Sequence, residues 1–313
     1  MEYRQLGRSG LTVSKLGLGC NNFGARIDEE QSLKVIRRAL DLGITFFDTA
    51  DVYGNRGLSE QYLGKALKGV RQEVIIATKF SSPMGEGPLW QGGSRRYIYQ
   101  AVHASLQRLE TDYIDLYQLH WPDPQTPIEE TLRALNDLIR EGIVRYIGCS
   151  NLTAAQVVEA QLTARLLHLT PFISAQNRYN LLSREVEREL LPLCQRYGLG
   201  FIPYYPLASG FLTGKYHRGE QPPEGTRLAR MTSMASELMT DENFDLLEKL
   251  ERFASDHGRS ISELALGWLA AQPAVDCVIA GATRPEQVEA NLKSLEWRLS
   301  DQDLAEVRDL LEE

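Results

Sequence analysis

The chain has 313 residues, of which 43% are apolar, and a formal net charge of −8, so it can build a large core but is a poor candidate for binding nucleic acid or an anionic membrane surface. No apolar run reaches the roughly 18 residues of a membrane-spanning helix, and the first residues, MEYRQLGRSG, lack the apolar core of a signal peptide. The four cysteines, Cys20, Cys149, Cys194 and Cys277, are far apart and lack metal-ligand spacing, so we expect reduced thiols in a cytoplasmic protein with no metal site and no membrane insertion.

The chain begins with a pattern typical of a β-hairpin, because Tyr3–Leu6 and Leu11–Ser14 flank a glycine-bearing turn. From Leu16 onwards, short apolar runs typical of buried strands alternate with segments of helical spacing. The expected strands are Leu16–Cys20, the run that starts at Phe46, Glu73–Lys79, Tyr113–His120, Val144–Asn151, Phe172–Gln176, Gly200–Leu207 and Asp276–Gly281. The expected helices are Glu29–Leu42, Ser59–Leu67 (with Ser59 as its N-cap), Arg95–Leu109, Pro127–Glu141, Thr153–Ala164, Val186–Tyr197, Phe244–His257, Ile261–Ala271, Pro285–Leu292 and Asp301–Leu311. Ser209–Thr240 is expected to be the longest irregular stretch.

Eight strand–helix units predict a closed parallel barrel of the (β/α)8 type, with residues 1–313 as a single domain. An open doubly wound sheet would need a glycine fingerprint after the first strand, and Gly17-Leu18-Gly19 lacks the third glycine at the required spacing. In a barrel the carboxyl ends of all strands share one mouth, so polar residues at those ends are expected to face one another.

Three successive strands end in this way at Asp48, Lys79 and His120, and Tyr53 follows Asp48 by five residues. Each has an ordinary alternative role, as a turn cap, a packed aromatic, a surface lysine or a satisfied core histidine. Together they suit proton delivery to a carbonyl. A tyrosine has a pKa of about 10, a neighbouring Lys79 ammonium would lower it, and Asp48 would keep Lys79 charged. Tyr53 is then a workable general acid, and His120 could orient the carbonyl or share the proton. None of the four supplies a hydride, so a reduction needs a cofactor.

Six motifs carry a family resemblance over nearly the whole chain: FDTADVYG, IATKF, DLYQLHWPD, GCSN, YYPLASGFLTGKY and GATRPEQVEAN. The chain resembles the aldo-keto reductases. The resemblance implies that Asp48, Tyr53, Lys79 and His120 form a catalytic tetrad with Tyr53 as the proton donor. It also implies a barrel that binds an extended NAD(P)H across its mouth without a Rossmann domain, and reduces aldehydes and ketones.

The resemblance further implies a set of cofactor contacts. Ser150, Asn151 and Gln176 match the contacts to the nicotinamide carboxamide, although Asn151 could also cap the next helix. Tyr204 matches the aromatic residue that stacks on the nicotinamide, although it could also be a core residue. Tyr205, Pro206, Leu207, Ser209, Gly210, Leu212 and Lys215 match the pyrophosphate cradle, and Gly281, Thr283, Arg284, Gln287 and Asn291 match the adenosine side. Cys20, Asn21, Asp48 and Arg227 complete the expected set.

Two departures from the family pattern bear on cofactor choice. Ala290 stands where the family often has an acid, and Gly281 stands where many members have a lysine. Arg284 is the remaining candidate for a 2′-phosphate partner, because a guanidinium matches phosphate geometry. We therefore expect NADPH, with NADH as the alternative.

The substrate pocket is expected to hold Tyr53, His120, Trp121, Phe23 and Trp90, which favours apolar or flat carbonyl compounds. Trp90 has the alternative of packing against its own loop. Two rival functions stay open. One is a Schiff-base lyase that uses Lys79. The other is a cofactor-sensing subunit bound to a membrane channel, the role of some relatives in the family, whose own chemistry is slow or vestigial. A homo-oligomer also stays open.

Overall fold

The computed structural model of the protein describes residues 1–312. The expected domain 1–313 also takes in Glu313, which lies outside the described residues. Among the described residues, no helix combines the length and the apolar character that crossing a membrane requires.

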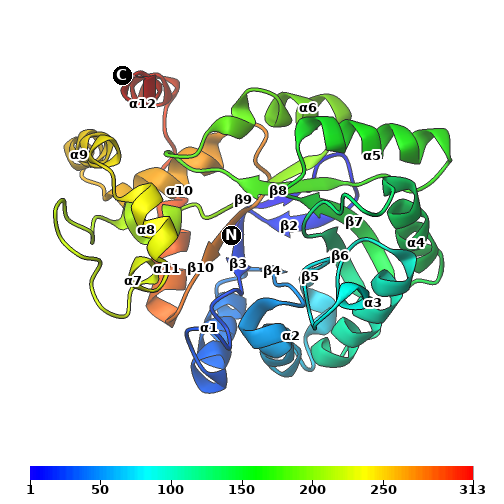
Figure 1. The fold of residues 1–313 in the computed structure, drawn as a ribbon. Helices are drawn as coiled ribbons and strands as arrows, with labels where there is room; N and C mark the ends of the chain where they lie inside the picture. Colours follow the sequence, from blue (N-terminus) through cyan, green and yellow to red (C-terminus); the bar gives the residue numbers. More distant parts are fainter. Residues whose placement is uncertain (313) are drawn as a thin grey trace.

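Eight parallel strands form the centre of the molecule, in the order β10-β3-β4-β5-β6-β7-β8-β9 (Figure 1). The parallel register runs from β10 and β3 round to β8 and β9, and a bridge between Phe201 and Val275 links β9 to the approach of β10. This arrangement confirms the predicted (β/α)8 barrel. The strands are β3 Leu16–Gly19, β4 Phe46–Asp48, β5 Ile75–Phe80, β6 Ile114–Leu119, β7 Val144–Ser150, β8 Ser174–Arg178, β9 Gly200–Tyr204 and β10 Val278–Gly281.

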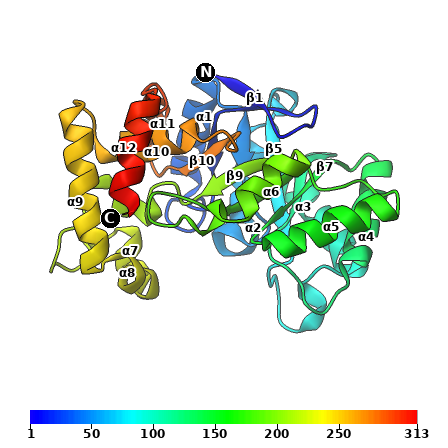
Figure 2. The same cartoon turned by 90° about the horizontal axis from the view of Figure 1, so that it is seen from above.

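Helices surround the strands (Figure 1), and the view from above shows helices on both sides of them (Figure 2). The helices are α1 Glu29–Asp41, α2 Tyr53–Ala66, α3 Arg95–Leu109, α4 Ile128–Arg140, α5 Ala154–Leu166, α6 Leu190–Tyr197, α7 Arg227–Arg230, α8 Thr232–Leu238, α9 Asp241–Asp256, α10 Ile261–Ala271, α11 Pro285–Ser294 and α12 Asp301–Glu312. Short 3-10 turns lie at Arg71–Glu73, Pro88–Trp90, Glu185–Glu187 and Ala208–Thr213. The helices form where apolar residues recur on one face: α4, for example, buries Leu132, Leu135 and Leu138 against the barrel.

The predicted hairpin is present as β1 (Tyr3–Gln5) paired with β2 (Thr12–Ser14). Its apolar residues Leu6 and Val13 join a core cluster with side chains of β4, β5, β6 and β9, so the hairpin packs beneath the strands. The Gly7 amide donates to Asp276 Oδ2 at 2.7 Å. A Cβ at Gly7 would come within 2.4 Å of the Gly200 amide nitrogen, so this close approach requires glycine. The hairpin leaves the opposite end, with the carboxyl ends of the strands, for the site.

Three local predictions were wrong. Ser59 does not cap α2: it is buried, donates to the Cys20 carbonyl at 2.8 Å, and meets Thr49 Oγ1 at 2.8 Å. The segment 54–57 has positive φ, so the regular part of α2 begins after Gly57. The strand expected to reach Leu207 ends at Tyr204, because Tyr205 takes φ 55°. The helix expected from Val186 is divided, and α6 begins only at Leu190.

Candidate active site

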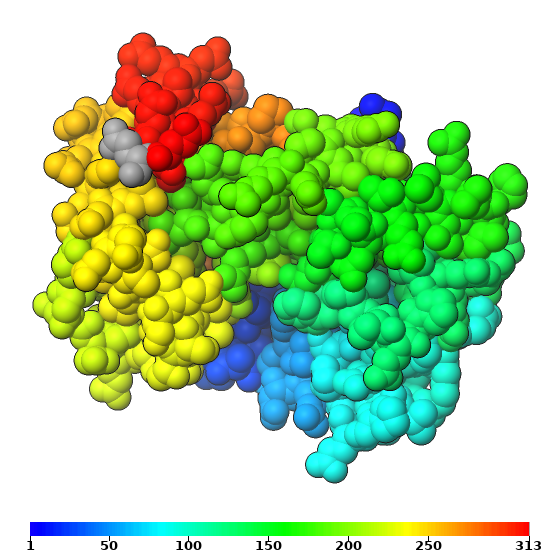
Figure 3. Space-filling view, turned by 45° about the horizontal axis from the view of Figure 1, so that its top comes forward, coloured from blue at the N-terminus to red at the C-terminus, as the bar shows by residue number. Residues whose placement is uncertain are grey.

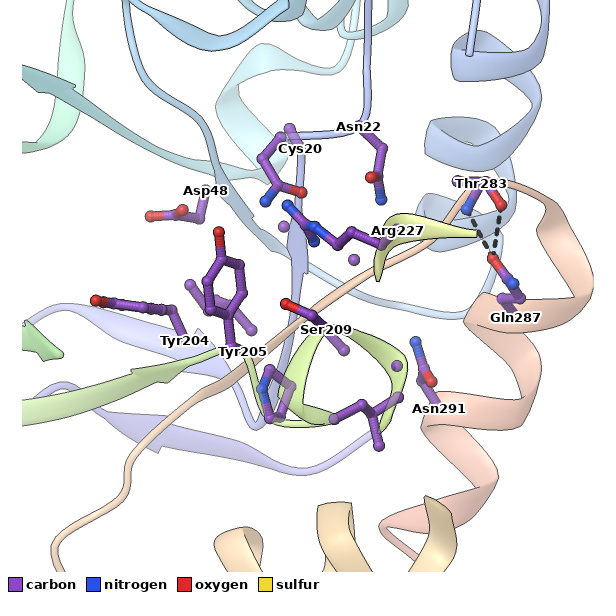
Figure 4. A pocket seen from close by; sticks show the side chains of 18 of the residues that line it. Cys20, Asn22, Asp48, Tyr204, Tyr205, Ser209, Arg227, Thr283, Gln287 and Asn291 are labelled. Carbon is purple, nitrogen blue, oxygen red and sulfur yellow. Dashed lines mark hydrogen bonds between the residues drawn. The ribbon is translucent and has the colours of Figure 1, made fainter. Parts of the chain in front are cut away.

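A cavity of about 910 Å³ opens at the carboxyl ends of the strands and extends towards α11. Figure 4 shows it running from Asp48, past Tyr205 and Ser209, to Gln287 and Asn291 on α11. Figure 3 shows the surface hollowed beside the yellow segment around α8, with blue N-terminal residues at the floor of the hollow. The cleft therefore extends from the carboxyl ends of the strands to α11, an extent that suits an elongated ligand.

A buried ion pair lies at one end of the cleft. Lys79 Nζ is 2.6 Å from Asp48 Oδ2 and donates to the Thr49 carbonyl at 2.8 Å. The Lys79 side chain is 0% exposed and that of Asp48 3%. Gln176 Nε2 donates to Asp48 Oδ1 at 2.7 Å. Burial disfavours the charged ammonium, but Asp48 and then Tyr53 outweigh it and raise the pKa of Lys79, so the amine is a cation at neutral pH.

Tyr53 lies between this ion pair and the cavity. It lines the cavity, and Lys79 Nζ lies 5.0 Å from the centre of its ring. Burial raises the pKa of Tyr53 to about 12, against the opposing charge of Lys79. Lys79 therefore acts in the expected direction, but the expected net lowering of the Tyr53 pKa is wrong, because desolvation of the phenolate outweighs the ammonium. The phenol is fully protonated at neutral pH.

His120 faces Tyr53 across the cavity, with the two rings perpendicular and 5.7 Å apart. Its Nδ1 lies 3.1 Å from Ser82 Oγ. Burial, followed by the charge of Lys79, lowers the pKa of His120 to about 3. The imidazole is therefore neutral and offers one hydrogen-bond donor and one acceptor. Of the two roles expected for His120, orienting a carbonyl fits this state, and sharing an acidic proton does not.

The residues expected to meet the nicotinamide carboxamide and to stack on the nicotinamide ring lie together at the ends of β7, β8 and β9. Asn151 Nδ2 donates to the His120 carbonyl at 2.9 Å, and Asn151 Oδ1 accepts from the Tyr204 hydroxyl at 2.7 Å. Ser150 Oγ donates to the Gln176 carbonyl at 2.7 Å. The alternative role of Asn151 as a helix cap is wrong, because Thr153 caps α5 through a capping box with Gln156.

Most of the other residues expected to contact the cofactor line the same cavity, and two do not. Leu212 is fully buried and does not line the cavity, and the exposed Arg284 also lies outside the lining. The residues that do line it are Cys20, Asn21, Asp48, Ser150, Asn151, Gln176, Tyr204, Tyr205, Pro206, Leu207, Ser209, Gly210, Lys215, Arg227, Gly281, Thr283, Gln287 and Asn291.

Some of the aromatic residues expected in the substrate pocket line the cavity, and others lie away from it. Trp121 lines the cavity, is 50% exposed and stacks on His120 with 5.9 Å between the rings. Phe23 is fully buried in the core and does not reach the cavity. Trp90 packs over Gly85 of its own loop, where a Cβ would lie 2.8 Å from the indole. Phe23 was therefore placed wrongly, and of the two roles expected for Trp90 the structure shows packing against its own loop, because the sequence does not reveal which side of a loop faces the core.

The sequence analysis missed several cationic residues of the cleft. Arg26 lines it from the loop after β3 and reaches across to donate to the Gly225 carbonyl at 3.1 Å. Arg178 lines it from the end of β8 and pairs with Glu237 of α8 at 2.5 Å. Lys293 lines it from α11. Arg178 could have been found, because it lies two residues after Gln176 and so points to the same face of the strand.

Comparison with known proteins decides the family. Residues 15–312 match the model of the Aldo/keto reductase family. The chain belongs to the aldo/keto reductase family. Its relatives include the "Probable voltage-gated potassium channel subunit beta" of Oryza sativa subsp. japonica, 40% identical over 302 residues, or 95% of this chain and 92% of that one.

Other relatives carry the names of enzymes. The "Aldo-keto reductase YhdN" of Bacillus subtilis (strain 168) is 37% identical over 319 residues, which cover 100% of this chain and 94% of that one. The "L-glyceraldehyde 3-phosphate reductase" of Escherichia coli O157:H7 is 37% identical over 321 residues, covering 98% and 91%. Members of the aldo/keto reductase family are oxidoreductases that generally use nicotinamide cofactors.

The cleft of this aldo/keto reductase family member fits a phosphate-bearing dinucleotide. Lys215 and Arg227 supply positive charge along it. Asn22 Oδ1 is buried at its wall and has no hydrogen-bond partner among residues 1–312, so a donor on a bound ligand would satisfy it. The chain from Ala208 to Gly210 holds three successive positive φ values, and such backbone is concentrated at binding loops. At the far end, Gln287 Oε1 accepts from the Thr283 amide at 2.7 Å, which orders the loop before α11 (Figure 4).

Proposed function

We propose that this protein reduces aldehydes or ketones to alcohols with NADPH, with Tyr53 as the general acid. The observation that carries the proposal is the position of the Tyr53 phenol. It lines the cavity beside the buried Lys79–Asp48 pair and faces His120 at a ring distance of 5.7 Å. A nicotinamide cofactor, when bound, supplies the hydride that no side chain can supply.

Tyr53 gives its proton to the carbonyl oxygen as that oxygen gains negative charge. A pKa of about 12 makes Tyr53 a weak acid, yet an aliphatic alcohol is weaker still, so the transfer to an alkoxide-like oxygen runs downhill. The phenolate that remains lies beside the Lys79 ammonium, which stabilises it. Asp48 accepts from Lys79 at 2.6 Å and holds the ammonium in place.

His120 orients the substrate in this proposal. Its neutral imidazole has one nitrogen engaged by Ser82, and the other is available to donate to the carbonyl oxygen. Trp121, stacked on His120 and half exposed, supplies an apolar wall for the substrate. The substrate is thereby held between Tyr53, His120 and Trp121.

The preference for NADPH over NADH is supported by cations of the cleft. Lys293 lies on α11, the same helix as Gln287 and Asn291, which match the adenosine contacts of the family. Lys293 is therefore a better candidate than Arg284 for the partner of a 2′-phosphate, because Arg284 does not line the cavity.

A fluorescence titration with NADPH and with NADH tests the cofactor proposal. We expect saturable binding that is tighter for NADPH, and a selective loss of that preference in Lys293→Met. Arg284→Met is the matched control, for which we expect an unchanged preference. Binding of neither cofactor by the wild-type protein would overturn the reductase proposal.

A second candidate function rests on the relatives named as potassium channel beta subunits, at 38–40% identity. A protein of that kind would bind the cofactor but turn it over slowly. Recovery of a membrane channel with the protein, together with negligible turnover on a panel of aldehydes, would favour it. The lyase is disfavoured, because a Schiff base needs a neutral amine and Lys79 is held charged by Asp48.

Two further parts of the proposal concern the whole chain. The four cysteines are buried and unpaired, which supports a reducing compartment such as the cytoplasm. The cleft draws residues from β3 through α11, which supports a single domain over the chain.

A further inference from the structure

Two buried threonines adjoin the two members of the Lys79–Asp48 pair. Thr49 directly follows Asp48, and Thr78 directly precedes Lys79. Successive side chains of a strand point to opposite faces, so Thr78 faces away from the side on which Lys79 meets Asp48. Both threonines are fully buried, and each bonds to the start of α2. The helix that follows Tyr53 is thus attached to the strands beside both charges.

The contact from Thr78 is to a buried carboxylate. Thr78 Oγ1 donates to Glu60 Oε1 at 2.5 Å, and Glu60 is 0% exposed. Beside it, Thr49 Oγ1 donates to Ser59 Oγ at 2.8 Å, because the hydroxyl hydrogen of Ser59 goes to the Cys20 carbonyl. Ser59 and Glu60 are neighbours in the first regular turn of α2. The two bonds therefore fix the position of that turn against the carboxyl ends of β4 and β5.

Glu60 has a second partner, which also supports the turn after Tyr53. Arg108, near the end of α3, donates from Nε to Glu60 Oε2 at 2.7 Å, and its side chain is 16% exposed. The turn consists of residues 54–57, whose φ values are all positive, and backbone of that kind persists where the surrounding structure imposes it. Gly57, at φ 124°, lies against Arg108, because a Cβ on Gly57 would come within 2.5 Å of Arg108 Cδ.

We propose that Glu60 and Arg108 are positioning residues, which hold the Tyr53 phenol in place beside Lys79. The inference rests on the proposed carbonyl reduction and deepens it. Glu60 binds the residue next to Lys79, and Arg108 binds Glu60 and contacts the turn next to Tyr53. One buried carboxylate thereby sets the position of both the proton donor and the cation that stabilises its phenolate. Neither Glu60 nor Arg108 lines the cavity, so both act through the backbone and not on the substrate.

The opposite end of β5 offers a matched control. There Arg71 pairs with Asp115 at 2.7 Å, with side chains 14% and 10% exposed, and Asp115 accepts from the Ile76 amide at 2.9 Å. Arg108→Met and Arg71→Met each leave a buried carboxylate without its cation, so we expect both variants to lose stability in urea unfolding. Only the first of the two pairs adjoins the reaction site.

Kinetics of these variants test the positioning role. In Arg108→Met we expect kcat to fall about tenfold, because displacing a reacting group by a fraction of an ångström already slows its step, while the KM for an aldehyde and the affinity for NADPH stay unchanged. In Arg71→Met we expect an unchanged kcat. Thr78→Val keeps the shape of the side chain but removes its bond to Glu60, so we expect kcat to fall here as well, and this variant carries the test if Arg108→Met does not fold. An unchanged kcat in Arg108→Met or in Thr78→Val, or an equal loss in Arg71→Met, would overturn the proposal.

The environment of Tyr53 gives a readout that does not depend on turnover. In a ¹³C spectrum of protein labelled at the tyrosine Cζ, the Tyr53 signal is identified by its absence in Tyr53→Phe. We expect this signal to move in Arg108→Met and in Thr78→Val, which removes no charge, and to stay in place in Arg71→Met. A Tyr53 signal that stays in place in Thr78→Val would overturn the positioning role. If the wild-type protein reduces no carbonyl, the proposed function fails, and this spectrum still decides whether Glu60 and Arg108 position Tyr53.

Discussion

Replacement of Lys79 by methionine separates the structural role of the buried pair from its chemical role. The change removes the ammonium but keeps the length of the side chain, and it leaves Asp48 as a buried carboxylate with its bond from Gln176 at 2.7 Å. Breaking one partner of a buried pair costs about 3–5 kcal/mol. Because Gln176 still donates to Asp48, we expect the lower end, about 3 kcal/mol, in urea unfolding.

The double variant Asp48→Asn with Lys79→Met gives the matched control. It buries no charge, so we expect it to recover most of the stability that Lys79→Met loses. Carbonyl reduction should not recover, because the phenolate of Tyr53 lacks its cation; we expect a loss of about 10²-fold or more in kcat in both variants. Near-normal reduction at neutral pH by either variant would refute the role given to Lys79. A loss of stability below about 1 kcal/mol in Lys79→Met would refute the buried ion pair.

Three more predictions follow from the site. Tyr53→Phe should abolish carbonyl reduction while the fluorescence titration still shows NADPH binding; weak binding in this variant would count against the role of Tyr53 as acid. His120 has a pKa of about 3 in the folded protein and about 6.5 in the unfolded chain. Between pH 6.5 and pH 3 only the unfolded chain binds a proton at His120, so the stability of the folded protein falls as the pH falls. At pH 5 this lowers the free energy of unfolding by about 2 kcal/mol. In urea unfolding at pH 7 and pH 5, His120→Gln should lack this part of the pH dependence. An equal pH dependence in the wild-type protein and in His120→Gln would contradict the low pKa of His120. Gly210→Ala should weaken NADPH binding, because a Cβ at φ 93° would lie 2.7 Å from Lys215 Nζ. Gly69→Ala has φ 89° and open space around it, so as a control it should lose stability, by about 1 kcal/mol, without losing NADPH affinity.

The barrel could be predicted from the sequence because each strand is short, apolar and bounded by turn residues. The polar residues at the ends of those strands, Asp48, Lys79 and His120, were predicted to meet because parallel strands end at one mouth. The structure places them together with Tyr53. The net pKa of Tyr53 could not be predicted, because it depends on how completely the phenol is desolvated, and burial is a property of the folded chain.

Other parts of the site could not be predicted because they depend on loop conformation. Phe23 and Trp90 follow strands as Trp121 does, yet only Trp121 faces the cavity. The cation Lys293 was overlooked because its approach to the cleft depends on how α11 is rotated against the barrel. Ser59 looks like a helix cap in sequence, but positive φ values before it move the helix start, and its hydroxyl donates to the Cys20 carbonyl just after β3 instead.

Transfer of deuterium from NADPH labelled at the nicotinamide C4 to an aldehyde tests the central claim most directly. The alcohol product is examined by mass spectrometry after incubation with the wild-type protein, and Tyr53→Phe serves as the control. We predict one deuterium on the carbinol carbon with the wild-type protein and no labelled alcohol with Tyr53→Phe. Absence of labelled alcohol from the wild-type protein across a panel of aldehydes and ketones, with NADPH bound, would contradict carbonyl reduction as the function of this site.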